Sequence, residues 1–215
     1  MKISVTNVPA DQRPIILEVE PEAAEFARSL AAWLESGIRG GDRFLDGQTV
    51  QFGWSLLLLR ETANGLEALE PDFQSLPTQW LPGVNSTVQH LQLQRAVCDL
   101  FNRELAFPEI RQTGLVSPKF YDNRECVMSR DSPENSDSGW VFHEPGYLGP
   151  EARYVSLYEL SLQKIEVIPF LALPPSSRVS IAPGRCAVTV DGVTKSSSNS
   201  EFLRALTTSS FRCKP

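Results

Sequence analysis

The segment that decides the fold of the second half of the chain is Cys126–His143, which reads CVMSRDSPENSDSGWVFH. It opens with the apolar run Cys126–Ser129 and closes with the aromatic run Trp140–His143. The loop residues between them, 131–139, are Asp, Ser, Pro, Glu, Asn and Gly. Such side chains compete with the backbone for hydrogen bonds, and Pro lacks an N–H donor. The pattern therefore predicts two short strands joined by a polar loop.

Short elements flank this segment on both sides. Ser156 and Glu159 have the spacing of a capping box, which predicts a short helix with Ser156 as its N-cap. An Asp-Gly pair between two apolar runs predicts a tight β-hairpin. The elements expected in this half are strands at 115–116 and 154–155, a helix from Ser156, the hairpin over 187–194 and a final helix at 201–206.

The first half begins with a short strand and a turn at 11–14, and continues with a helical pattern. One apolar stripe recurs at three- and four-residue spacing, made of Ala23, Phe26, Ala27, Leu30, Trp33 and Leu34. The glycines Gly37, Gly40 and Gly41 are expected to end this helix. Apolar residues then alternate over Val50–Leu58, which predicts one strand with a single buried face.

Two further signals complete the first half. Asn64-Gly65 predicts a hairpin turn with a return strand at 66–69. A helix capped by Asn85 or Ser86 is expected to run to about Asn102, and His90 is expected to face solvent in its first turn.

These elements predict an α+β fold of two small domains, mainly antiparallel strands with a few helices packed on them. The Pro-marked junction near 104–112 suggests the boundary. We expect an α+β domain over 1–105, a second α+β domain over 112–182, and a tail over 183–215 that holds the hairpin and the weak last helix.

Composition narrows the function classes. The chain has 215 residues, 41% hydrophobic and 21% charged, which is typical of a soluble globular protein. Its longest clean apolar run, Leu56–Leu59, is far shorter than the roughly 20 residues that cross a membrane. Asp and Glu outnumber Lys and Arg 26 to 20, a net charge of −6, which argues against general nucleic-acid binding. Five of the acids lie within 131–151, a stretch without Lys or Arg.

The cysteines and the amino terminus indicate a cytoplasmic protein. Met1–Val5 shows no secretory signal pattern. Cys98, Cys126, Cys186 and Cys213 are too widely spaced for a zinc site and are expected to be free thiols.

No motif in the sequence indicates catalysis, a metal or a cofactor. The cluster Gly37-x-x-Gly40-Gly41 lacks the Lys and Ser or Thr of a phosphate-binding loop. The acids of 131–151 do not have the spacing of a calcium loop. A hydrolase that uses Cys126 or Cys98 with His143 can be imagined, but neither a third member nor an oxyanion loop is visible.

A binding role fits the same residues. Trp140, Phe142 and Tyr147 flank the acidic loop, and interfaces favour Trp and Tyr beside charges that speed association. A core position for Trp140 is the alternative. The candidate contact residues are Asp131, Glu134, Asp137, Trp140, His143 and Glu144.

Over 113–182 the chain resembles the immunity protein 33 family, small bacterial domains found beside polymorphic or contact-delivered toxins. The resemblance rests on an ordered series of motifs, of which Asp137-Ser138-Gly139-Trp140 is the most specific. The others are Leu115-Val116-Ser117, the Met-x-Arg-Asp run at 128–131, Tyr154–Leu157 and Ile168–Leu171. Pro118 stands where the family usually has lysine, and a glycine-rich lead-in is reduced to Gly114.

The resemblance implies a small α+β domain that neutralises a cognate toxin by binding it, without catalysis or cofactor. The partner would be a toxin or effector protein, with no nucleic acid or membrane involved, and a homodimer is also considered. Two alternatives stay open at this point. One is the cysteine/histidine hydrolase; the other is a structural or adaptor module of a secretion or toxin system, such as type VI secretion, docking through Trp33 or Trp80.

Overall fold

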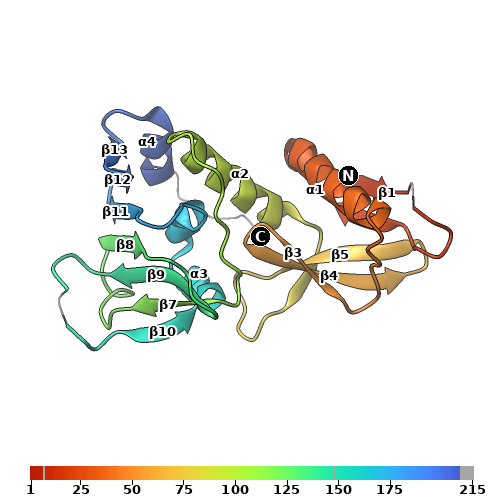
Figure 1. Cartoon of the computed structure of the whole chain (residues 1–215), viewed down its shortest axis with the longest axis horizontal. Helices are drawn as coiled ribbons and strands as arrows, with labels where there is room; N and C mark the ends of the chain where they lie inside the picture. Colours follow the sequence, from red (N-terminus) through yellow and green to blue (C-terminus); the bar gives the residue numbers. More distant parts are fainter. Residues whose placement is uncertain (7, 148, 209–215) are drawn as a thin grey trace. The chain divides into compact units, whose positions relative to one another are not determined.

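The computed structural model describes residues 1–6, 8–147 and 149–208 of the chain. Cys213 and the end of the predicted tail therefore lie outside the described residues. The chain divides into two compact units, Met1–Gln92 (unit 1) and Leu93–Pro215 (unit 2), shown in Figure 1. The domain boundaries that the sequence suggested stay predictions.

Unit 1 is built on one mixed sheet of six strands. Strand order is β1-β2-β5-β4-β3, with β6 also on β5, and of the described pairs only β2 and β5 run parallel. The elements are β1 (Lys2–Val5), β2 (Ile15–Glu18), η1 (Pro21–Ala23), α1 (Ala24–Arg39), β3 (Thr49–Phe52), β4 (Ser55–Thr62), β5 (Gly65–Pro71), β6 (Trp80–Pro82) and the start of α2 (Asn85–Asp99).

Helix α1 confirms the predicted amphipathic helix, and it ends at Gly40, its C-cap, as predicted for the Gly40-Gly41 pair. Its buried face includes Ala27, Leu30 and Leu34, which share one core with sheet residues such as Leu17 and Leu57. Gly37 does not end the helix, contrary to the prediction. It lies inside α1, where a Cβ would be 2.6 Å from the Asp42 carboxylate, the end of a side chain that can move aside.

The predicted single strand at 50–58 is wrong. Gly53, at φ 60°, turns the chain, and β3 and β4 form a hairpin in which Phe52 pairs with Ser55. Across such a two-residue turn the buried parity changes, so Leu57 and Leu59 are buried, not Leu56 and Leu58. The next hairpin, β4 to β5 around Asn64 and Gly65, forms as predicted.

Helix α2 starts where the sequence predicts, but differs from the prediction in the group that caps it and in the orientation of His90. It begins at Asn85, one of the two predicted cap residues, and N–H groups of its first turn bind a residue of another strand. The buried carboxylate of Glu70, on β5, accepts hydrogen bonds from Ser86 N (3.0 Å) and Thr87 N (2.7 Å). Burial raises the pKa of Glu70, and these bonds oppose the rise.

His90 is buried, not solvent-facing, because the rings of Trp54 and Phe73 enclose it. Its ring centroid lies 5.7 Å from that of Trp54 and 4.8 Å from that of Phe73. Neither imidazole nitrogen has a hydrogen-bond partner, and burial lowers the pKa of His90 to about 3. The imidazole is therefore neutral at physiological pH.

Unit 2 is built on a mixed sheet of seven strands, in the order β10-β7-β9-β8-β11-β12-β13, in which only the described pair β7–β9 is parallel. The predicted α+β class, mainly antiparallel with a few helices, is confirmed in both units. The elements are β7 (Thr113–Val116), β8 (Cys126–Arg130), β9 (Asp137–His143), β10 (Arg153–Ser156), α3 (Leu157–Gln163), η2 (Ile165–Phe170), β11 (Arg178–Ala182), β12 (Arg185–Val190), β13 (Val193–Ser196) and α4 (Glu201–Thr208).

Several local predictions for unit 2 are confirmed. Ser156 caps α3 by accepting a 3.1 Å hydrogen bond from Glu159 N. The β12–β13 hairpin turns at Asp191 and Gly192, both with positive φ. The core gathers Phe120, Trp140 and other large side chains that are fully buried. Among the described residues, no helix has the length and apolar character to cross a membrane.

Candidate partner-binding site

The loop between β8 and β9 ends in a small hydrogen-bonded turn, which we call the acidic tip (residues 131–137). Glu134 N donates to Asp137 O at 3.0 Å, and Asp137 N donates to Glu134 O at 2.8 Å. This reciprocal pair forms an isolated β-bridge around Asn135 and Ser136, and Asn135 takes the left-handed conformation at φ 52°. The tip therefore has one defined backbone shape.

Gly139 allows the strand to return beneath the tip. Its φ is +76°, and a Cβ there would lie 2.2 Å from the carbonyl oxygen of Asp131, so only glycine fits. Its N–H donates to the Asp137 carboxylate at 2.8 Å, and its carbonyl accepts from Asp131 N at 2.8 Å. The hydrogen bonds of Asp137 and Gly139, and the absence of a Cβ at Gly139, therefore determine the fold of the tip.

The neighbouring strand β7 also holds the tip. Gln112 Nε2 donates to Asn135 O at 3.0 Å, and Thr113 N donates to Ser136 O at 2.8 Å. Ser138 Oγ donates to Thr113 O at 2.7 Å from the adjacent strand. Because bonds from two sides fix its backbone, the tip presents its side chains in a preorganised arrangement.

Three of the predicted contact residues meet at this tip. Asp131 and Glu134 are exposed, and Asp137 is half-buried. Glu134 and Asp137 stand directly opposite each other in the bridge, an arrangement in which like charges repel. Within the described ranges, no Lys or Arg forms an ion pair with any of the three.

Glu144 and His143 lie at the other end of β9. The strand's seven residues separate them from the tip by about 20 Å. Ser117 Oγ donates to the Glu144 carboxylate, and His143 Nδ1 lies 2.9 Å from Glu144 O. Partial desolvation raises the pKa of Glu144, but the Ser117 bond and the nearby His143 and Lys119 outweigh it, so the pKa is lower than usual. The structure thus divides the predicted face into two separate places.

Trp140 occupies the core under the tip. Its side chain is fully buried, and its Nε1–H donates to Leu171 O at 3.0 Å. A partner docking on this surface would not touch it. Trp140 therefore supports the hairpin that carries the tip, in agreement with the core position that the sequence left open.

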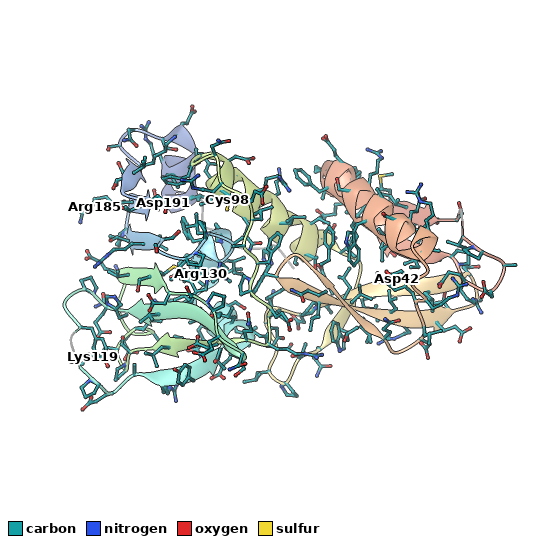
Figure 2. The ribbon with its side chains drawn as sticks, viewed as in Figure 1. Asp42, Cys98, Lys119, Arg130, Arg185 and Asp191 are labelled. Carbon is teal, nitrogen blue, oxygen red and sulfur yellow. The ribbon has the colours of Figure 1, made fainter. Side chains whose placement is uncertain are left out.

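Sequence reasoning missed the role of Arg130, which is labelled in Figure 2 and is only 2% exposed. Its guanidinium donates to the carbonyls of Ala106, Leu171 and Leu173, and its Nε donates to Ser138 O at 3.3 Å. No carboxylate in the described part of the chain pairs with it, and burial lowers its pKa to about 10. The Met-x-Arg-Asp motif was the available signal, since an Arg in an otherwise buried strand needs acceptors.

The described cysteines are buried thiols without activation. Burial raises the pKa of Cys98 to about 11 and the pKa values of Cys126 and Cys186 to about 12. These thiols are protonated at neutral pH, whereas a catalytic cysteine needs a lowered pKa. No group of three His, Cys, Asp or Glu side chains that could hold a metal occurs within residues 1–6, 8–147 and 149–208.

Comparison with known proteins finds a similarity that lies in unit 2. Neither a curated protein nor a solved structure matches the chain. One family model matches, that of the Imm33-like domain, over residues 93–191. The match starts at the first residue of unit 2 and ends in the β12–β13 turn, so it contains the acidic tip, Arg130 and Trp140. Residues 93–191 thus match the model of the Imm33-like domain, in agreement with the resemblance to the immunity protein 33 family that the sequence motifs indicated.

Proposed function

We propose that unit 2 is an immunity protein that neutralises a cognate bacterial toxin or effector by direct binding, without catalysis. The observation that carries this proposal is the acidic tip within the Imm33-like domain. Glu134 and Asp137 face each other without a cation, on a backbone fixed by two hydrogen bonds. A partner that brings Lys or Arg to the tip relieves this repulsion. The tip therefore favours binding to a basic partner surface.

The tip also meets the kinetic and entropic requirements of a docking site. Its backbone is held by Gln112, Thr113 and Gly139, so little conformational freedom is lost when a partner binds. Exposed carboxylates attract a basic partner over about 10 Å at moderate salt. The predicted result is fast, salt-sensitive association.

The distribution of charge along the chain indicates that a partner of unit 2 would be attracted by individual acids and not by net charge. Residues 1–92 hold six Lys and Arg against twelve Asp and Glu, whereas residues 93–215 hold fourteen of each. The net charge of −6 therefore belongs to residues 1–92, and residues 93–215 are neutral as a whole. Attraction of a toxin to unit 2 then depends on the placement of its acids at the tip, and not on net charge.

The remaining predicted contacts take a secondary place in the proposal. Glu144 and His143 lie at the far end of β9 and would form a separate contact. A partner bound at the tip reaches them only if its surface extends about 20 Å along the strand. We place binding in the cytoplasm of the toxin-producing cell, where no cofactor, nucleic acid or membrane is required. A protein that works beside a type VI secretion effector is one such setting.

The hydrolase alternative has no supporting feature among the described thiols. Cys126 and His143 are on neighbouring strands, but burial keeps the Cys126 thiol protonated. The adaptor alternative keeps one supporting observation, since Trp33 on α1 is 44% exposed and its ring lies tilted, 5.6 Å from that of Phe52. That pair lies in unit 1, outside the Imm33-like match.

The experiment uses the protein encoded by the neighbouring gene as the probe. The variant D131K/E134K/D137N reverses two of the tip charges, neutralises the third, and keeps an Oδ1 acceptor at 137 for Gly139 N. The matched control D99K/E104K/D122N makes the same charge change at exposed acids elsewhere in unit 2. We expect the tip variant to weaken binding by about tenfold or more at low salt and to lose most of the salt dependence. The control should bind as the wild type does.

Two outcomes contradict the proposal. Equal weakening by the tip variant and its control would assign the effect to general charge. Wild-type affinity in the tip variant would move the binding surface elsewhere on unit 2.

A further inference from the structure

Strand β10 is an open edge of the unit 2 sheet. It is the terminal strand in the sheet order and, in the part of the chain that the structure describes, pairs with β7 alone, as Figure 1 shows at the bottom of that sheet. Tyr154 of this strand is 62% exposed, and Arg153 and the preceding Glu151 are exposed as well. Edge strands with free backbone groups are templates for pairing with another strand.

The hydrogen-bond phase of β7 determines which backbone groups of β10 are free. Leu157 N donates to Gln112 O at 2.9 Å, so the pairs that exchange hydrogen bonds with β7 are the alternate ones, containing Arg153 and Val155. Thr113 N points the other way, toward Ser136 O on the β9 side, which agrees with this phase. The N–H and C=O groups of Tyr154 therefore face outward, and the same alternation, continued one residue before β10, assigns this direction to Ala152.

The charges along this edge are self-complementary. Glu151 and Arg153 flank Ala152, one on each side. When two such edges meet antiparallel about Ala152, Glu151 of each copy stands directly opposite the partner's Arg153. This pairing places two opposite-charge cross-strand pairs at one short edge. An Arg without a nearby acid would disfavour pairing of two copies, because the positive charges would repel. Glu151, two residues earlier, instead offers an opposite charge to the Arg153 of a second copy.

We infer that β10 pairs with β10 of a second copy of this chain, antiparallel and centred on Ala152, which joins two seven-stranded sheets into one. In this register the two Ala152 residues exchange both backbone hydrogen bonds. Tyr154 N–H donates to the carbonyl of the partner's Pro150, which as a proline offers no donor in return. The pairing therefore ends at Pro150.

Other registers conflict with the charges. Because the outward groups belong to even-numbered residues, only registers that pair even with even residues form hydrogen bonds. Centring on Arg153 sets the two Arg153 side chains against each other, and centring on Glu151 does the same with the two carboxylates. Centring on Tyr154 leaves Arg153 opposite Val155. The register about Ala152 is thus the one that pairs opposite charges.

The test measures self-association of the full chain by sedimentation velocity over a range of concentrations. The variants are E151R, R153E and the swap E151R/R153E, each checked for folding by circular dichroism. We expect wild type to dimerise, and each single reversal to raise the dissociation constant by about tenfold or more, because two attractive pairs become repulsive. The swap should restore wild-type association. An equimolar mixture of E151R and R153E should form a mixed dimer that neither forms alone.

Other results overturn the inference. A wild-type chain that stays monomeric up to about 200 µM shows that the edge does not self-pair. A dimer that is indifferent to the reversals, or that the swap fails to restore, lies on another surface. If the reversals instead weaken binding of the toxin candidate by a monomeric chain, the edge receives that partner. The tip variant D131K/E134K/D137N should dimerise normally, so failure of the proposed function leaves this result unaffected.

Discussion

Arg130 and Trp140 share one acceptor: both donate to the carbonyl oxygen of Leu171, and the guanidinium carbon lies 5.5 Å from the Trp140 ring centroid. Both residues belong to the motifs on which the family resemblance rests. Their shared acceptor lies just after η2, a turn that carries Pro169 and whose C-terminal carbonyls would otherwise be buried unpaired. The motif therefore maintains the unit 2 core, and the exposed tip is carried on top of it.

Replacing Arg130 should strongly destabilise unit 2. The variant R130M fills the space but leaves the carbonyls of Ala106 and Leu173 without their guanidinium donor. We expect a loss of about 2–4 kcal/mol in the free energy of unfolding, measured by urea titration. R178M, at an exposed position on β11, is the control and should change it by less than about 0.5 kcal/mol. Equal effects of both substitutions would contradict the assigned role of Arg130.

The shared acceptor predicts energetic coupling. W140F keeps the buried ring and removes the Nε1–H donor, and should cost about 1–2 kcal/mol. In a double-mutant cycle with R130M, the two effects should deviate from additivity by about 0.5 kcal/mol or more, because each variant leaves Leu171 O to the other donor. Strict additivity in urea unfolding would show that the two side chains act independently.

Gly139 should be far less tolerant of substitution than a glycine of similar backbone conformation elsewhere. G139A places a methyl group against Asp131 O and should cost about 2–4 kcal/mol while deforming the acidic tip. Gly184, at φ +70°, has nothing within 4 Å of its Cβ position, so G184A should cost only about 1 kcal/mol. Thermal melts of both variants make the comparison. A smaller loss for G139A than for G184A would contradict the close approach of the Asp131 carbonyl to Gly139.

His90 should make unit 1 sensitive to acid. Its folded pKa of about 3 is lower than the ordinary 6.5, so below pH 6.5 the unfolded chain binds a proton that the folded chain does not. Stability present above pH 6.5 is then lost progressively as the pH falls toward 3, by an amount on the order of 4 kcal/mol. H90F should remove most of this slope. Glu70, with a raised pKa, contributes in the opposite sense in both proteins, so the difference between them isolates His90.

Hydrogen exchange that resolves unit 1 from unit 2 provides the measurement. The difference between H90F and wild type should be confined to peptides of residues 1–92. An unchanged pH slope in H90F would show that another group controls acid stability.

The described thiols should resist labelling in the native state. Cys98, Cys126 and Cys186 are buried with raised pKa values, so an alkylating reagent at neutral pH should modify them only as fast as unit 2 opens. Peptide mapping by mass spectrometry distinguishes these positions. Fast, selective labelling of Cys126 in folded protein would revive the hydrolase alternative.

The parts of the structure that sequence could predict are those that depend on near neighbours. Ser156 with Glu159, the Asp191-Gly192 turn and the Asn64-Gly65 turn are set by residues within a few positions, and each forms as expected. The β3–β4 hairpin was missed because Val50–Leu58 alternates as a strand does, and only Gly53 signals the turn.

The features that failed prediction depend on residues far apart in the chain. The cap of α2 is Glu70, from another strand, and the enclosure of His90 needs Trp54 and Phe73. For the candidate site, the acids of the loop were predictable from composition. Their division between the two ends of β9, and the burial of Trp140, required the register of the sheet.

The boundary between the two units falls inside α2, and this limits how the protein can be divided. A fragment that starts at Leu93 removes the first half of a helix, and one that starts at Asn85 keeps the helix but loses the Glu70 carboxylate that receives its leading N–H groups. Transplanting the Imm33-like part onto another carrier thus needs a replacement acceptor at that helix end, or a fusion joint upstream of β5.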